Sequence, residues 1–314
     1  MKTARTAFVC LLITACLYQS SWAAGANFSV WAERRTIVHN GLERIYEVRV
    51  PTGALRSEAR VPLVLVLHGR GGSSRDTEKI TGFTFLAVSE HFIVVYPEGA
   101  RLKGPLTWNA GHCCGDAMRG DVDDVGFIDA LLDRLIEDYP IDPGRVYVTG
   151  MSNGAMMAHR LGIDLSHRIA AIAPVIGAIF GDEKPPSHPV SALIINGMQD
   201  NIIPYAGGIP AGASLSAWDG TPFAPGSKQA SFWAAANECD GNPDLLSGAD
   251  TIVTRYRCPD GRRVLSYLIR NMGHTWPGAK TGKFWADRRE PSFYTTEVIW
   301  AFFKTNAKKL PSSP

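Results

Sequence analysis

The sequence predicts an α/β fold built on a doubly wound, mostly parallel sheet. Short apolar runs without polar alternation are typical of strands buried on both faces of such a sheet. They alternate along the chain with amphipathic helical segments, which is the pattern of right-handed β–α–β crossovers. Neither an internal repeat nor a long Ser/Pro linker interrupts this alternation, so residues 24–314 are expected to form a single domain.

The expected elements follow from residue type and periodicity. A β-hairpin is expected first, because two alternating segments flank the turn-forming pair Asn40-Gly41. Strands rich in β-branched and apolar residues are then expected at 61–67, 92–97, 146–149, 170–176, 192–197, 253–257 and 264–269. Helices are expected at 83–89, from Asp123 or Asp124 to Tyr139, and at 155–161, 226–237 and 291–304. Residues 205–226, dense in Gly, Ala, Pro and Ser, are expected to be a small loop-rich insertion over the sheet.

Composition and charge limit the class of partner. The 314 residues are 45% hydrophobic and 20% charged, which is ordinary for a globular protein. Lys2 and Arg5 account for the whole net charge of +2. A neutral remainder argues against nucleic acid or another highly charged polymer as the main partner.

The first 23 residues are expected to be a signal peptide. Lys2 and Arg5 precede an apolar segment at 7–18, and Ser21-Trp22-Ala23 is a small-x-small cleavage site. The apolar segment is too short to span a bilayer, so no transmembrane segment is expected. The protein is therefore expected to be secreted or periplasmic. As an alternative, Ile13-Thr14-Ala15-Cys16 resembles a lipobox, which would make the protein a lipoprotein tethered to the membrane at Cys16.

Four cysteines remain after the signal segment, and an even number in an exported protein suggests disulfides. Cys239 and Cys258 flank a short polar segment and are expected to form a local bridge. Cys113 and Cys114 either form a vicinal bridge or stay reduced. Adjacent cysteines without a C-x-x-C spacing do not make a zinc site, so no metal and no cofactor is expected.

Ser152 is the candidate nucleophile. Gly150-Met151-Ser152-Asn153-Gly154 fits G-x-S-x-G between an expected strand and an expected helix. Such a turn is strained, and side chains at its two glycines would collide with the neighbouring elements. It would lift the hydroxyl out of the sheet and over a helix N-terminus, where a developing anion is favoured.

Two further loops can supply the partners of the serine. Asp200 follows the strand at 192–197, and His274 follows the strand at 264–269 on a loop stiffened by Gly and Pro. A base must reach the nucleophile, and an acid must orient the base. The order Ser152, Asp200, His274 is the order expected for a parallel sheet whose loops meet at the strand carboxyl ends.

Several segments together resemble the bacterial polyhydroxybutyrate-depolymerase-type esterases, which are related to feruloyl and acetylxylan esterases within the α/β-hydrolase superfamily. The matching segments are LHGRGGS, TWNAGHCCG with VDDVGF, GMSNGAMMAHRL, INGMQDNIIPYAGG and GHTWPG, which span residues 45–300. The resemblance implies Ser152 as nucleophile, Asp200 as acid and His274 as base. It also implies an oxyanion hole formed by the backbone N–H groups of Arg70 and Asn153. Asn196 departs from the His that members often carry before the acid loop.

The resemblance implies ester hydrolysis through an acyl-enzyme, on short hydroxyalkanoate esters or oligomers or on feruloyl-type esters. Trp108, Tyr205 and Trp276 lie on loops expected to surround Ser152 and are candidates for substrate binding. The chain ends soon after its last expected helix, which favours soluble esters or oligomers over crystalline polymer. The alternatives are a peptidase, or a non-catalytic surface-binding protein on the same scaffold.

Overall fold

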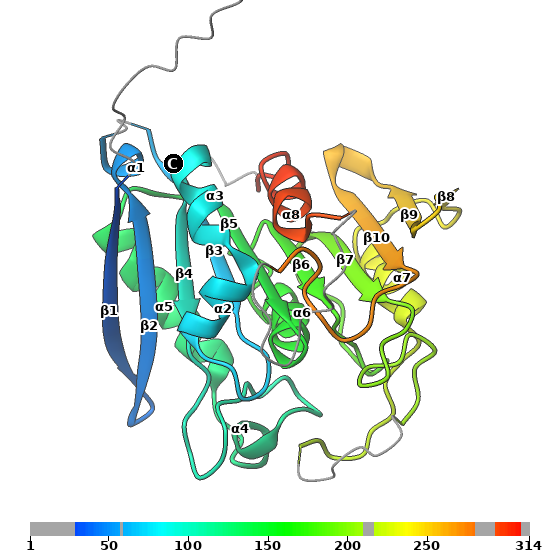
Figure 1. Cartoon of the computed structure of the whole chain (residues 1–314), viewed down its shortest axis with the longest axis horizontal. Coiled ribbons are helices and arrows are strands. Elements are labelled where there is room, and N and C mark those ends of the chain that lie inside the picture. Colours follow the sequence, from blue (N-terminus) through cyan, green and yellow to red (C-terminus); the bar gives the residue numbers. More distant parts are fainter. Residues whose placement is uncertain (1–28, 57–58, 210–216, 280–292, 309–314) are drawn as a thin grey trace, which may run out of the picture.

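The computed structural model describes residues 29–56, 59–209, 217–279 and 293–308 (Figure 1). The expected signal peptide and Cys16 lie outside these residues, as does the middle of the expected insertion. Ten strands form one sheet in the order β1-β2-β4-β3-β5-β6-β7-β10-β9-β8. The six strands from β4 to β10 in this order are paired in parallel, and antiparallel strands continue the sheet on both sides. This mostly parallel arrangement confirms the predicted fold class.

The strands agree closely with those expected. The hairpin is confirmed, since His39 pairs with Leu42 around the Asn40-Gly41 turn. The strands are β1 (Val30–His39), β2 (Leu42–Pro51), β3 (Val61–Leu67), β4 (Ile93–Pro97), β5 (Ile141–Met151), β6 (Ala171–Val175), β7 (Ser191–Gly197), β8 (Asp244–Ser247), β9 (Thr251–Arg257) and β10 (Arg263–Ile269). β5 begins earlier than expected, and its pairing with β3 shifts register between Val61 and Leu63.

The helices are less completely predicted. They are α1 (Thr52–Arg56), α2 (Ser74–Thr81), α3 (Phe83–Glu90), α4 (Gly115–Arg119), α5 (Asp124–Asp138), α6 (Asn153–Asp164), α7 (Gly226–Ala236) and α8 (Thr295–Phe303). The sequence does not reveal α1, α2, α4 or the short strand β8. α2 lacks an apolar stripe, because its buried positions are Ser74, Thr77 and Thr81. Within the described ranges, every helix is too short or too polar to cross a lipid bilayer.

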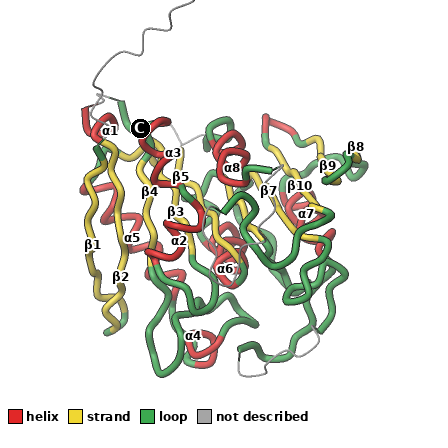
Figure 2. The backbone as a smooth tube through the Cα atoms, in the orientation of Figure 1, coloured by secondary structure: helices red, strands yellow, loops and turns green. Residues whose placement is uncertain are grey.

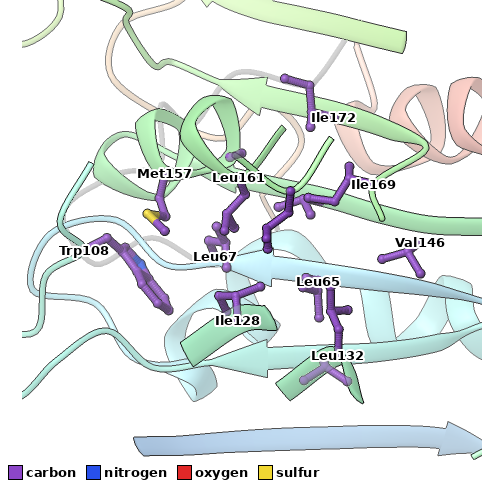
Figure 3. Close-up of a cluster of buried hydrophobic side chains, with 14 of the residues drawn as sticks. Leu65, Leu67, Trp108, Ile128, Leu132, Val146, Met157, Leu161, Ile169 and Ile172 are labelled. Atoms are coloured by element: carbon purple, nitrogen blue, oxygen red, sulfur yellow. The ribbon is translucent and has the colours of Figure 1, made fainter. Parts of the chain in front are cut away.

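Helices cover both faces of the sheet, which explains the unbroken apolar run of β3. Leu63, Leu65 and Leu67 pack into the core beneath α5, α6 and α7. Val64 and Val66 face the opposite core, beneath α3 and α8. Figure 3 shows part of the first core, with Leu65 and Leu67 among side chains from the neighbouring helices. A strand with helices on both sides has no solvent-facing position for a polar residue.

The predicted bridge between Cys239 and Cys258 is confirmed. Cys113 and Cys114, whose state the sequence leaves open, are also joined by a disulfide. The bridge between Cys239 and Cys258 links the end of α7 to the end of β9 across a sequence separation of 19. Closing a loop of this length stabilises a protein by about 3 kcal/mol in the chain-entropy model.

A buried histidine links α6 to α7. His159 is fully buried, its Nε2 lies 2.8 Å from Gln229 Oε1, and Trp233 Nε1 donates to its Nδ1 at 2.9 Å. The indole can only donate, so Nδ1 carries no proton and Nε2–H donates to Gln229. Burial lowers the pKa of His159 to about 4, because the neutral ring is the form that this site accepts.

We predict that His159 makes the protein less stable in mild acid. Between pH 6.5 and 4 the unfolded chain protonates this side chain and the folded chain does not, so stability falls as pH falls. From pH 7 to pH 5 the loss from one such group is on the order of 2 kcal/mol. Urea unfolding at both pH values should show a smaller loss for H159Q, which cannot titrate. Equal losses in the two proteins would contradict the prediction.

Candidate active site

The structure brings together the three side chains expected to form a triad. Ser152 Oγ lies 2.9 Å from His274 Nε2, and His274 Nδ1 lies 2.8 Å from Asp200 Oδ2. The three residues follow β5, β7 and β10, so they meet at the carboxyl edge of the parallel strands. Loops gather along this edge in Figure 2. Since each hydrogen bond is within normal length, the arrangement can pass a proton between the hydroxyl and the imidazole.

The turn at Ser152 has the strained backbone expected of a nucleophile. Ser152 has φ 55° and ψ −123°, a conformation that L residues rarely adopt, and it is immediately followed by α6. A Cβ at Gly154 would lie 2.5 Å from the backbone oxygens of Leu67 and His68, at the end of β3. A Cβ at Gly150 would lie 2.8 Å from Leu67 Cβ. Both glycines are therefore required by the close approach of the turn to β3.

The carboxylate of Asp200 is held from two directions. Oδ1 accepts hydrogen bonds from the backbone amides of Ile202 at 2.9 Å and Ile203 at 2.8 Å, which leaves Oδ2 facing His274. The acid loop also lies directly on the histidine loop, since Gln199 N donates to Met272 O at 2.9 Å. His274 and Asp200 are therefore fixed relative to each other by backbone contacts as well as by their own hydrogen bond.

The two expected oxyanion donors flank the serine. A Cβ on Gly69 would lie 3.4 Å from Ser152 Cβ, which places the loop carrying Arg70 beside the hydroxyl. Asn153 is the first residue of α6, where the helix dipole favours negative charge. Throughout the described ranges, neither the Arg70 amide nor the Asn153 amide donates a hydrogen bond to the protein. Both N–H groups are thus available to a bound oxygen.

Trp108 does not line the site, and its assignment as a substrate-binding residue is wrong. Its side chain is 0% exposed, and its indole Nε1 donates to His68 O at 3.0 Å. The ring packs against the imidazole of His68, with centroids 5.1 Å apart. A loop tryptophan whose N–H finds a buried acceptor belongs to the core.

Trp276 is also misassigned. It is 2% exposed, donates from Nε1 to Thr296 Oγ1 at 3.3 Å, and packs edge-on against Phe83. Its ring therefore belongs to the core beneath α3 and α8. Tyr205 is the candidate that keeps exposed surface, although its ring packs against Gly226.

The segment with the two cysteines pairs with the described part of the insertion. Cys113 forms a β-bridge with Trp218, and Gly115 N donates to Ala217 O at 2.7 Å. The ring of His112 bridges Asp219 and Asp182 at 2.7 and 2.8 Å. Although burial lowers the pKa of His112, the hydrogen bonds with both carboxylates raise it above its ordinary value. The two loops that flank the site are therefore one connected unit.

One residue near the site had no role assigned from the sequence. His68 is fully buried, and burial lowers its pKa to about 4. Its position directly before the glycine-rich loop is the feature of the sequence that could have identified it. Among the described residues, no group of three His, Cys, Asp or Glu side chains is arranged to hold a metal ion.

Comparisons with known proteins identify the family of the chain. A family described as esterase PHB depolymerase matches residues 44–218. An esterase named NocK from Nocardia uniformis subsp. tsuyamanensis is 33% identical over 78% of this chain and 74% of its own length. Feruloyl esterase B from Piromyces equi is 29% identical over 75% of this chain and 43% of its own length.

Poly(3-hydroxyalkanoate) depolymerase C from Paucimonas lemoignei is 33% identical over a shorter region, 41% of this chain and 30% of its own length. The solved structure of an acetyl xylan esterase from Aspergillus awamori shares the fold, with a TM-score of 0.61 at 14% identity, over 87% of this chain and 99% of that one. The chain therefore belongs to the polyhydroxybutyrate-depolymerase family of esterases, which are carboxylic-ester hydrolases with the α/β-hydrolase fold.

Proposed function

We propose that this protein is an exported serine esterase in which Ser152 is the nucleophile, His274 the general base and Asp200 the acid that orients it. The observation that carries the proposal is the continuous hydrogen-bonded chain from Ser152 Oγ through the His274 ring to Asp200. Asp200 accepts from His274 Nδ1–H, so Nε2, which lies 2.9 Å from Ser152 Oγ, is the nitrogen that takes the hydroxyl proton.

Hydrolysis proceeds in two steps. Ser152 Oγ attacks the ester carbonyl while His274 Nε2 takes its proton, and the tetrahedral intermediate expels the alcohol, which receives that proton. Water then attacks the acyl-enzyme with His274 as base, which releases the acid and restores the serine. The Arg70 and Asn153 amides hold the oxyanion in both steps, and one such donor typically contributes about 3 kcal/mol of barrier reduction.

The acyl group is proposed to be aliphatic, as in short hydroxyalkanoate esters and oligomers. Met198 lies two residues before Asp200 and is 42% exposed, and Ile202 lies two residues after it and is 44% exposed. Two of the three aromatic candidates for substrate binding, Trp108 and Trp276, are buried, so their rings are not available to stack on a feruloyl group. The relative from Paucimonas lemoignei is named as a hydroxyalkanoate depolymerase, which agrees with an aliphatic acyl group.

Replacement of Ser152 by alanine tests the triad. The S152A variant should keep its fold and lose several decades of turnover on p-nitrophenyl butyrate, because it removes the hydroxyl that lies 2.9 Å from His274 Nε2. Circular dichroism would establish that the variant is folded. Unchanged hydrolysis by a folded S152A protein would overturn the assignment.

Rates on three ester classes test the proposed substrate. The wild-type protein should have its highest kcat/KM on hydroxybutyrate oligomers, with methyl ferulate and acetylated xylan slower, because the loop that carries Asp200 exposes the apolar side chains of Met198 and Ile202. Rates measured side by side at the same pH give the comparison. A higher kcat/KM on methyl ferulate would show that the site instead accepts an aromatic acyl group.

Export is supported by the charged and apolar segments at 1–18 and by the bridge between Cys239 and Cys258, a type of bond that persists in oxidising compartments. The full-length chain expressed in a bacterium should be recovered outside the cytoplasm with residues 1–23 removed. Mass spectrometry of the N-terminus distinguishes this outcome from a lipidated Cys16. A cytoplasmic chain that retains residue 1 would contradict export.

A further inference from the structure

We propose that Trp108 is a positioning residue that fixes the two proposed oxyanion donors relative to each other. The inference rests on the proposed function, because it takes the Arg70 and Asn153 amides as the oxyanion hole. Trp108 lies on the loop after β4, touches neither Ser152 nor His274 by any hydrogen bond of the described residues, and is fully buried (Figure 3). Its hydrogen bonds connect it directly to Asn153 and, through His68, to the peptide group that carries the Arg70 amide.

The first connection runs to Asn153. The backbone N–H of Trp108 donates to Asn153 Oδ1 at 2.8 Å, and Asn153 Nδ2 donates back to Trp108 O at 3.1 Å. This pair of hydrogen bonds uses both ends of the side-chain amide, so the Asn153 side chain has one orientation. Asn153 is 1% exposed, and its own backbone amide is the donor that follows the nucleophile. The loop after β4 is thereby attached to the start of α6.

The second connection runs to the strand end before Arg70. The indole Nε1–H of Trp108 donates to His68 O at 3.0 Å, and the two rings are in contact at an interplanar angle of 34°. The same carbonyl oxygen lies against Gly154, where a Cβ would be 2.5 Å away. The indole thus fixes the peptide that contacts the nucleophile turn.

The imidazole of His68 carries this connection on to the Arg70 amide. Gly99 N–H donates to His68 Nε2 at 2.8 Å, so that nitrogen is unprotonated and Nδ1–H donates to Gly69 O at 2.7 Å. Gly72 N also donates to Gly69 O, at 3.0 Å. The Gly69 carbonyl and the Arg70 N–H belong to one planar peptide group. Fixing the carbonyl therefore fixes the direction of the Arg70 N–H.

Burial keeps the His68 imidazole of this arrangement in one protonation state. Because the pKa of His68 is lowered to about 4, its ring stays neutral in neutral solution, and Nε2 remains an acceptor for Gly99. Trp108 and His68 together form a rigid support between the two donors. Displacement of a reacting group by about 1 Å can cost 100-fold in rate, so such a support affects the chemical step more than substrate binding.

The W108F variant tests the support, because it keeps an aromatic ring beside His68 and removes the indole N–H together with part of the buried ring, a loss of volume that the control below matches. We expect kcat on p-nitrophenyl butyrate to fall by about tenfold or more, with KM within about twofold of the wild-type value. Affinity for an alkyl trifluoromethyl ketone, whose serine adduct carries an oxyanion, should fall in parallel with kcat.

The matched control is W233F. Trp233 is equally buried and donates from its indole to His159, which takes part in none of the hydrogen bonds that connect Trp108 to Asn153 and His68. It should lower stability without lowering kcat or the affinity for the ketone. If the folded W108F protein matches W233F in kcat and ketone affinity, Trp108 only packs the core and the inference fails.

N153A provides a second test that does not alter the core ring. It removes both side-chain hydrogen bonds to Trp108 and keeps the backbone amide donor. Its kcat should fall as in W108F, and the double variant should lose little more than the more impaired single variant, because either change breaks the same support. Independent, multiplicative losses would contradict a single support. An active S152A protein would instead refute the proposed function itself.

Discussion

The candidate active site depends on one close backbone contact, between the turn after β5 and the carboxyl end of β3. Gly154 lies against the carbonyl oxygens of Leu67 and His68, with no space for even a methyl group. This contact brings the start of α6 and the glycine-rich loop after β3 to the same place. Because these backbone segments are in direct contact, the serine hydroxyl lies next to both the N-terminus of α6 and the loop that carries the Arg70 amide.

A buried ion pair supports the loop after β4, which carries Trp108. Arg44 on β2 donates to Asp124 at 2.5 Å, and the other oxygen of Asp124 accepts from Asn109 N at 2.6 Å. Burial raises the pKa of Asp124, and the charge of Arg44 opposes that effect. Removing one partner of such a pair typically costs 3–5 kcal/mol, since the other charge is left buried. The pair fixes the chain directly after Trp108.

The parallel strands and the three side chains of the proposed triad could be predicted from the sequence, because each depends on local patterns. β3 is apolar throughout and β7 has an apolar centre, and Ser152, Asp200 and His274 each follow a strand that can be recognised alone. For α5, Asp123 accepts from Gly126 N and caps the helix, whereas Asp124 is its buried first residue. From the sequence alone, either aspartate can be the N-cap of this helix.

The direction of a loop side chain could not be predicted in the same way. Trp108 and Trp276 were expected to face substrate, and each instead donates its indole N–H to a group that is distant in the sequence, His68 O and Thr296 Oγ1. Tertiary contacts of this kind leave no local pattern. The helix α2 was missed for a related reason, since its buried side consists of small hydroxyl residues.

The central claim is that Ser152 is the nucleophile of an assembled triad, and covalent labelling tests it most directly. The wild-type protein should react with one equivalent of a fluorophosphonate, and peptide mass spectrometry should place the label on the peptide that contains Ser152. A label on another residue, or undiminished labelling of the folded S152A protein, would contradict this account.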